Sequence, residues 1–122
     1  MTITHIAFVM YPVTDMERAA SFYREVFGLR QTPAVGEAGA ANQWVEFDSG
    51  GATFGIGNFE EAGTPGAAQS LALEVDDLSS FRSMLAKRGI ESSEPYETSI
   101  CWISAVGDPD GNRFYLNQSK AG

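Results

Sequence analysis

The chain carries the same pattern of strand, helix and turn residues twice, and this repeat limits the folds that it can adopt. Residues 4–10, THIAFVM, align with residues 69–75, QSLALEV, at an offset of 65 positions, which places His5 opposite Ser70. Both stretches alternate in the period-two manner of a strand with one buried face. Because each stretch is followed by a helical segment and a glycine, we expect one structural unit to occur twice.

An amphipathic helix is expected after each of these strands. The first helix begins with a capping box at Thr14, and Gly28 supplies the residue that ends it. The second helix begins near Asp76 or Asp77 and ends at Gly89. In both segments the apolar residues recur at helical spacing, so each helix has one side for packing.

Three further strands are expected after each helix. They cover about residues 30–35, 42–48 and 52–58 in the first half and 91–97, 100–106 and 112–118 in the second. At an offset of 60 positions, DSGGATFGIG aligns with DPDGNRFYLN, which places Gly55 opposite Tyr115 and Glu46 opposite Val106. Turn chemistry and strand phase therefore repeat together, and each half is a βαβββ unit.

The two units predict an α+β fold in a single domain. One βαβββ unit exposes a whole sheet face, so two tandem modules must pair to form a concave, partly closed mixed sheet around a pocket. The domain spans residues 1–122, with module one at about 1–58, a linker at about 59–68 and module two at about 69–122. The modules can pair within one chain or across a dimer, and the sequence leaves both arrangements open.

The charge of the chain argues against two classes of partner. There are 16 acidic and 8 basic residues, the formal net charge is −8, and the basic residues are scattered along the sequence. Because proteins that bind nucleic acid or anionic membranes present a basic patch, we expect neither partner.

The composition of individual segments indicates the cellular location of the protein. No stretch approaches the ~18 consecutive apolar residues of a membrane span, and the N-terminus lacks the basic start and the cleavage site of a signal peptide. We therefore expect a cytoplasmic protein. The single cysteine, Cys101, excludes an internal disulfide and a cysteine-rich zinc cluster, and we expect it to be an inert strand residue.

Four motifs resemble those of a known superfamily. They are His5 in THIAFVM, the run VTDMERAASFYREVFGL, the run LALEVDDL and the closing DPDGNRFYLNQ. In this order they resemble the vicinal oxygen chelate superfamily, which includes glyoxalase I, extradiol dioxygenases, fosfomycin-resistance enzymes and bleomycin-binding proteins. The resemblance covers essentially the whole chain and implies the paired-module fold and a homodimer. It does not settle the reaction, because a fold does not fix a function.

The resemblance also implies four positions for metal ligands. Carried over residue by residue, they are His5 and Ser70 on the first strands, with Gly55 and Tyr115 on the last strands. The family has His, Glu or Gln there, so His5 alone matches. A catalytic divalent ion usually needs at least three protein donors. We therefore expect no metal cofactor; if an ion binds, its ligands are His5, Glu46 and Tyr115.

Strand alternation predicts which side chains line the pocket. Phe54, Ile56, Phe114 and Leu116 should lie under the helices. The inward set is His5, Ala7, Val9, Trp44, Glu46, Thr53, Gly55, Gly57, Ser70, Ala72, Glu74, Trp102, Ser104, Arg113, Tyr115 and Asn117. The candidate ligand-binding residues among them are His5, Trp44, Glu46, Ser70, Trp102, Arg113 and Tyr115. Aromatic rings with a few polar groups are typical of a small-molecule pocket.

Three functions remain open at this point. The preferred hypothesis is a metal-independent protein that binds a small organic molecule in the cup between the modules. One alternative is a lyase, transferase or dioxygenase of the same superfamily that uses a divalent metal with His5 and Glu46. The other is a metal-free enzyme in which His5 acts as a general acid or base.

Overall fold

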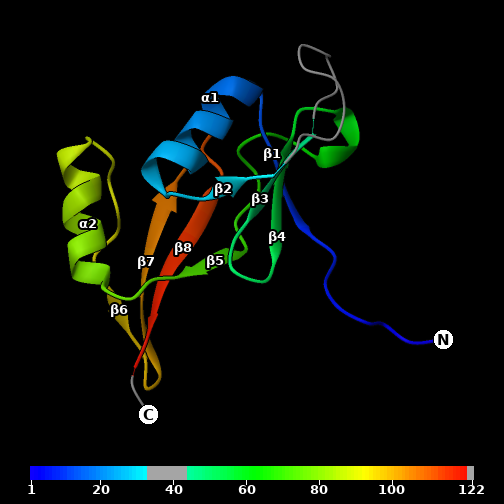
Figure 1. Cartoon of the computed structure of the whole chain (residues 1–122). Coiled ribbons are helices and arrows are strands. Elements are labelled where there is room, and N and C mark those ends of the chain that lie inside the picture. Colours follow the sequence, from blue (N-terminus) through cyan, green and yellow to red (C-terminus); the bar gives the residue numbers. More distant parts are fainter. Residues whose placement is uncertain (33–43, 121–122) are drawn as a thin grey trace.

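Two four-stranded sheets form the framework of the protein. The computed structural model describes residues 1–32 and 44–120. Sheet A has the strand order β1-β4-β3-β2 and sheet B the order β5-β8-β7-β6 (Figure 1). The strands are β1 Val9–Pro12, β2 Arg30–Gln31, β3 Trp44–Asp48, β4 Thr53–Gly57, β5 Leu71–Glu74, β6 Tyr96–Glu97, β7 Cys101–Gly107 and β8 Arg113–Ser119. Strand β1 pairs parallel with β4, and β5 pairs parallel with β8. All other strand pairs are antiparallel. The predicted α+β fold with two βαβββ units is confirmed.

Each module contributes one main helix, and both helices have the expected ends. The α-helix α1 spans Met16–Ser21 and continues as the π-helical segment η1 Phe22–Val26, while α2 spans Leu78–Lys87 and a short 3₁₀ helix, η2, spans Glu60–Ala62. Asp15 caps α1 and Asp77 caps α2, each through a bond to a backbone N–H three residues on. Gly28 and Gly89 have positive φ angles of 67° and 75°, which lets the chain leave each helix.

No helix among the described residues is long and apolar enough to cross a membrane. The predicted capping box at Thr14 is wrong by one residue, because the cap is Asp15. The Thr14 hydroxyl donates instead to Asp110 Oδ1 at 2.6 Å, in the turn between β7 and β8.

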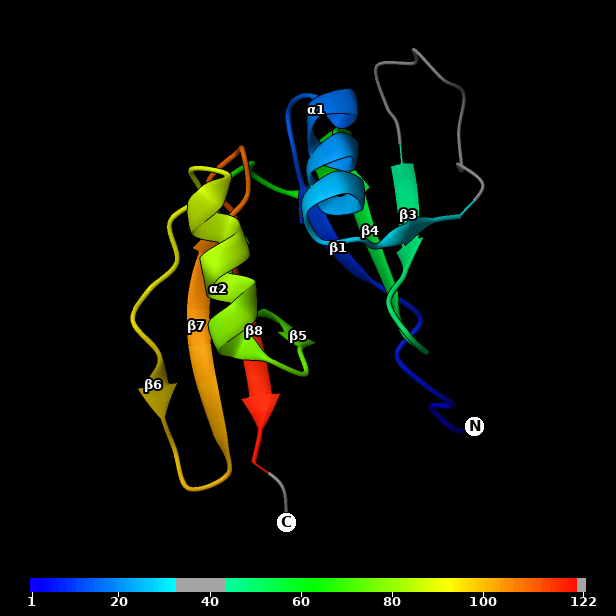
Figure 2. The ribbon, with the colours of Figure 1, turned by 60° about the vertical axis from the view of Figure 1, so that its left-hand side comes forward.

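Both helices lie on the same side of the two sheets (Figure 2), and they bury one shared core. Tyr23 contacts the rings of Phe54 in sheet A and Phe114 in sheet B, with centroid distances of 4.9 and 5.9 Å. Phe27 contacts Phe114 at 4.8 Å and Phe81 of α2 at 5.5 Å. The predicted burial of Phe54, Ile56, Phe114 and Leu116 under the helices is confirmed. The helix-facing sides of both sheets therefore meet inside the chain.

The first strand lies in a different register from the predicted one. It covers Val9–Pro12 and not residues 4–10. Val9 pairs with Phe54 and Leu71 pairs with Phe114, so Val9 is the structural counterpart of Leu71 and the offset is 62 positions, not 65. The error has a physical cause: IAFVMYPV is apolar at nearly every position, so an apolar pattern alone allows several registers.

The third strand of module two is also out of phase with the prediction. Glu46 pairs with Gly55 in sheet A, whereas Ala105 pairs with Tyr115 in sheet B. The counterpart of Glu46 is therefore Ala105 and not Val106. The turn at 108–112 is one residue longer than the turn at 49–52, and a shift of one residue moves every side chain to the other face of the sheet.

A buried polar network connects the modules at this longer turn. The side chain of Asn112, fully buried, donates to Pro12 O at 2.6 Å and accepts from Gly66 N and Ala68 N at 2.9 and 3.2 Å. It also donates to Asp108 Oδ2 at 2.9 Å. One amide thus ties together the end of β1, the linker and the β7–β8 turn.

We predict that Asn112→Ala destabilises the fold strongly. The change leaves Pro12 O, Gly66 N and Ala68 N without their partner, and each unpaired buried group costs about 1–3 kcal/mol. The free energy of unfolding in urea should fall by about 3 kcal/mol. Asn117→Ala serves as the matched control, because Asn117 lies nearer the surface and bonds mainly to Glu74. Equal losses in the two variants would contradict a special role for Asn112.

We also predict that the free energy of unfolding falls in alkaline solution, partly because of the buried hydroxyl of Tyr23. Burial raises the pKa of the Tyr23 hydroxyl, and the adjacent Asp108 carboxylate, which accepts its proton at 2.8 Å, raises this pKa further. Above about pH 10 the unfolded chain loses this proton and the folded chain keeps it. The contribution is therefore complete below pH 10 and decreases above it, by up to ~1.4 kcal/mol per pH unit. Unfolding measured from pH 8 to 11 should show a shallower decrease for Tyr23→Phe; equal slopes would contradict the assignment.

Candidate functional site

The candidate site lies on the sides of the sheets that face away from the helices. We call these sides the open faces. The open face of sheet A carries Met10, Pro12, Trp44, Glu46, Asp48, Thr53, Gly55 and Gly57. That of sheet B carries Ala72, Glu74, Cys101, Ile103, Ala105, Gly107, Arg113, Tyr115, Asn117 and Ser119. Strand pairing assigns these residues, because partners in adjacent strands point to the same side.

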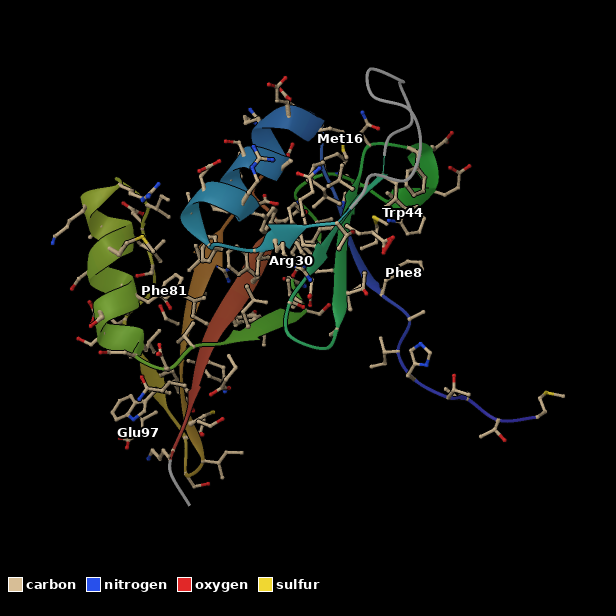
Figure 3. All side chains as sticks on the ribbon, in the orientation of Figure 1. Phe8, Met16, Arg30, Trp44, Phe81 and Glu97 are labelled. Carbon is tan, nitrogen blue, oxygen red and sulfur yellow. The ribbon has the colours of Figure 1, made fainter. Side chains whose placement is uncertain are left out.

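Aromatic rings gather on the open face of sheet A. The Trp44 ring lies 4.8 Å from the Phe8 ring in an edge-on contact and 5.7 Å from the Phe59 ring in a stacked contact. Phe8 and Trp44 lie close together where the N-terminal segment leaves β1 (Figure 3). We call Phe8, Trp44 and Phe59 the aromatic platform. Such rings offer large flat apolar contacts to a ligand.

The platform lies over a glycine, at a position where the superfamily carries a metal ligand. A Cβ atom on Gly55 would lie 3.2 Å from Met10 Cε and 3.3 Å from Trp44 Nε1. The indole N–H of Trp44 is buried and has no hydrogen-bond partner in the described part of the chain. Buried donors normally have a partner, so this N–H marks a polar group in the platform that the described residues leave unsatisfied.

The open face of sheet B is polar. Arg113 and Glu74 are exposed there, and Tyr115 and Asn117 are partly buried. Glu74 accepts bonds from the Ser119 backbone N–H at 2.8 Å and from the Asn117 amide at 2.7 Å. These bonds lower the pKa of the Glu74 carboxyl, and the bond from the Ser119 backbone has the largest effect. The face therefore holds an oriented Asn117 together with the charged Arg113.

The predicted site residues lie in three separate places. Trp44 and Glu46 are on sheet A, and Ser70, Arg113 and Tyr115 belong to module two near or on sheet B. The other two candidates, His5 and Trp102, lie elsewhere. His5 is exposed in the N-terminal segment, and its Nδ1 is 3.0 Å from the hydroxyl of its neighbour Thr4. Ala7 is exposed in the same segment.

Trp102 is on the helix side of sheet B, because it pairs with Gln118 while Ser104 pairs with the buried Leu116. It lines a small cavity of about 280 Å³ beside the start of α2, and Lys120 Nζ lies 5.5 Å from its ring. The inward orientation predicted for Trp102 and Ser104 is therefore wrong, as it is for Val9, which pairs with the buried Phe54. All three corrections follow from the two register differences described above.

Phe8 and Phe59 of the aromatic platform, and Met10 of the strand beside it, were not among the predicted candidates. The helix caps contained the signal that would have found Phe8. Asp15 and Asp77 are 62 positions apart, and this offset places Phe8, not His5, opposite Ser70. Phe59 falls in the predicted linker and could not be placed by strand alternation.

The donor set does not fit a metal ion of the kind that the superfamily implies. In the observed register the four ligand positions are Phe8, Ser70, Gly55 and Tyr115, and Phe8 and Gly55 have no donor atom. Within residues 1–32 and 44–120, no group of three or more His, Cys, Asp or Glu side chains is arranged to hold an ion. We therefore derive no chemical step through a metal.

A larger cleft, of about 690 Å³, lies beside the β7–β8 turn, and Ala105, Gly107 and Arg113 of the open face of sheet B form part of its lining. It is bounded by Phe22, the segment after α2 and the β7–β8 turn. Its lining comes mainly from loop residues, and the Asp108 carboxylate in it already accepts bonds from Tyr23, Asn112 and the Asp110 backbone. Among the described residues that line this cleft, no buried side-chain donor lacks a hydrogen-bond partner.

Comparisons with known proteins agree with the fold. The model of the Glyoxalase/Bleomycin resistance protein/Dioxygenase superfamily matches residues 2–116. The chain belongs to this superfamily. No curated protein matches its sequence.

Solved structures include similar proteins over nearly the whole length. TnmS3, an antibiotic binding protein from Streptomyces sp. CB03234, has 29% identity and a TM-score of 0.81, with 98% of this chain and 99% of that chain covered. A glyoxalase/bleomycin resistance protein from the same organism has 28% identity and a TM-score of 0.76, with 91% and 97% covered. The fosfomycin resistance protein FosX from Mesorhizobium loti has 21% identity and a TM-score of 0.71, with 94% and 91% covered, and shares the fold.

We predict that Gly55→Val disturbs the aromatic platform. The new methyl groups would press on Met10 and Trp44, and overpacking of this kind costs about 1–3 kcal/mol. In a Trp102→Phe background, the emission of Trp44 should shift and the melting temperature should fall. Gly107→Val is the control, since the nearest atom to a Cβ there is 3.9 Å away. An unchanged Trp44 emission in Gly55→Val would contradict the described packing.

Proposed function

We propose that the protein binds a small organic molecule with a flat aromatic part, without a metal ion, and acts as a homodimer. The observation that supports this most is the aromatic platform over Gly55, together with the buried indole N–H of Trp44, which has no hydrogen-bond partner among residues 1–32 and 44–120. Flat apolar contact supplies affinity, and a few polar groups fix the orientation of a ligand. The likeness to TnmS3, described as an antibiotic binding protein, supports a small organic molecule as the ligand.

The alternative enzymes have less support. A metal-dependent reaction through His5 and Glu46 needs both side chains at one ion, but His5 lies in the exposed N-terminal segment and Glu46 on β3. An acid or base role for His5 needs a partner that orients the imidazole, and the described contact of His5 is with its neighbour Thr4. The cytoplasmic location stays a prediction from the sequence.

A ligand panel tests the proposal. Bleomycin, tetracycline, naphthoic acid and a cationic acridine are each added while the melting temperature is followed, because a ligand that binds the native state stabilises it. At least one aromatic compound should raise the melting temperature in proportion to the logarithm of its concentration. Zinc, nickel, manganese and iron ions should give no stoichiometric binding. No shift with any compound, or one tightly bound ion per chain, would overturn the proposal.

The two tryptophans provide a matched pair of variants. Trp44→Ala removes the centre of the platform and should weaken binding at least tenfold, about 1.4 kcal/mol. Trp102→Ala removes the same volume from the helix side of sheet B and should leave affinity within twofold. Titration calorimetry with the best compound measures both. Equal losses of affinity would place the ligand elsewhere on the protein.

A further inference from the structure

We propose that the protein has a second binding site, for a small organic cation, on the helix side of sheet B. The site consists of the Trp102 ring, the Glu97 carboxylate and the cavity beside the start of α2, and the ammonium group of Lys120 occupies its charged end. Glu97 lies below α2, well apart from Phe8 and Trp44 (Figure 3). The site is therefore separate from the aromatic platform and does not rest on the proposed function.

Strand pairing places an aromatic ring and a carboxylate side by side. Trp102 of β7 pairs with Glu97 of β6, and partners in adjacent strands project from the same face of a sheet. Strand β6 is at the end of the strand order of sheet B, and the Trp102 side of the hairpin keeps its ring 36% exposed. A carboxylate beside a tryptophan ring attracts a cation through its charge and through the quadrupole of the ring.

A lysine of the chain itself already fills this position. Lys120 Nζ lies 5.5 Å from the centre of the Trp102 ring and 2.6 Å from Glu97 Oε2. The first distance is within the range of about 6 Å over which a cation is attracted to an aromatic ring. The backbone N–H of Lys120 donates to Ile100 O at 2.8 Å, which holds this residue beside the β6–β7 hairpin. Lys120 is therefore an internal stand-in for the cationic group of a ligand.

The lysine can be displaced at little cost to the fold. The side chains of Lys120 and Glu97 are 33% and 52% exposed, and exposed ion pairs contribute little to stability because water solvates the separated charges well. The ammonium group can move into solvent while the backbone of Lys120 stays bonded to Ile100. A ligand cation then gains the same ring and the same carboxylate. Competition with Lys120 lowers the apparent affinity of the wild type, because only the fraction of chains with the site vacated can bind.

The adjoining cavity of about 280 Å³ gives room for the apolar body of a ligand. It is lined by Asp77, Leu78, Ser79, Pro95, Trp102 and Gln118. Trp102 therefore borders both the cavity and the position of the Lys120 ammonium. The Asp77 carboxylate and the Gln118 side-chain oxygen accept bonds from backbone N–H groups at the start of α2. They offset the positive end of this helix, so the cavity does not repel a cation.

The chemistry of the site favours an alkylated ammonium group on a short apolar chain. A lysine ammonium is compact and strongly hydrated, whereas a quaternary ammonium group loses less hydration when it moves onto an aromatic ring. Tryptophan rings are the aromatic surfaces that bind such groups best. The formal net charge of −8 also attracts cations to the protein. We therefore expect a small alkylammonium compound.

Choline and its neutral isostere 3,3-dimethylbutan-1-ol test the site, because they have the same shape and differ in charge. Nuclear magnetic resonance follows the indole N–H signals of Trp44 and Trp102, which are the two tryptophans of the chain, and Trp102→Phe assigns them. Choline should move the Trp102 signal and leave the Trp44 signal in place. The neutral alcohol should bind about tenfold more weakly, since it lacks the attraction to the ring and to Glu97.

Variants of the two lysines test the role of Lys120. Lys120→Ala removes the internal occupant and should bind choline about threefold more tightly than the wild type. Lys87→Ala is the matched control, because it removes the same charge from α2, and it should bind choline as the wild type does. In the Lys120→Ala background, Glu97→Gln should weaken choline binding about threefold, because it removes the carboxylate and keeps the shape.

Three results would each overturn this second site. They are a Trp102 signal that choline does not move in Lys120→Ala, equal affinities for choline and the neutral alcohol, and equal affinities of Lys120→Ala and the wild type for choline. Movement of the Trp44 signal alone would also overturn it, because the cation would then lie on the aromatic platform. The proposed function is tested on that platform with flat compounds, so its failure is seen at Trp44 and the failure of the second site at Trp102.

Discussion

The buried amide of Asn112 is the constraint on which the arrangement of the modules depends. Its bonds join the end of β1, the linker and the β7–β8 turn, and Asp108 extends the network to Tyr23 in the core. A buried polar network is stable only when all its members are paired. The modules cannot rotate apart without leaving several buried groups unpaired, so the network holds both open faces in fixed directions.

This fixed arrangement explains why the candidate site lies on the sheet faces and not in the seam between the modules. The seam is filled by the shared aromatic core, which leaves the sheet faces as the surfaces free for binding. In module one, the position that corresponds to Ser70 holds Phe8, and the absence of a side chain at Gly55 lets Trp44 pack closely against the strand. Two positions at which the resemblance implies an ion ligand thus hold a phenylalanine and a glycine, which offer no donor to an ion.

The sequence predicted the architecture correctly and the phase of two strands wrongly. Repeated turns, helix ends and the burial of Phe54 and Phe114 depend on local chemistry that a sequence displays directly. The register of β1 depends on its pairing with β4, and the apolar run around it allowed a shift of three residues. The side of the sheet on which Trp102 lies depends on the length of the turn at 108–112. One added residue in this turn moves every side chain of β7 to the opposite face. Both errors concern the pairing of strands that are distant in the sequence, and the local pattern of apolar residues does not determine this pairing.

The two open faces differ in what they can contribute to recognition. Apolar contact with Phe8, Trp44 and Phe59 is nearly independent of direction, so it supplies affinity to many flat molecules. Hydrogen bonds from β8 depend on geometry, and Asn117 is already oriented there by Glu74. Discrimination between ligands should therefore reside in β8, whose open-face residues can change without disturbing Phe114 and Leu116 on the opposite side of the same strand. Under the proposed function, the alternation of a single strand would thus separate the residues that select a ligand from those that hold the fold.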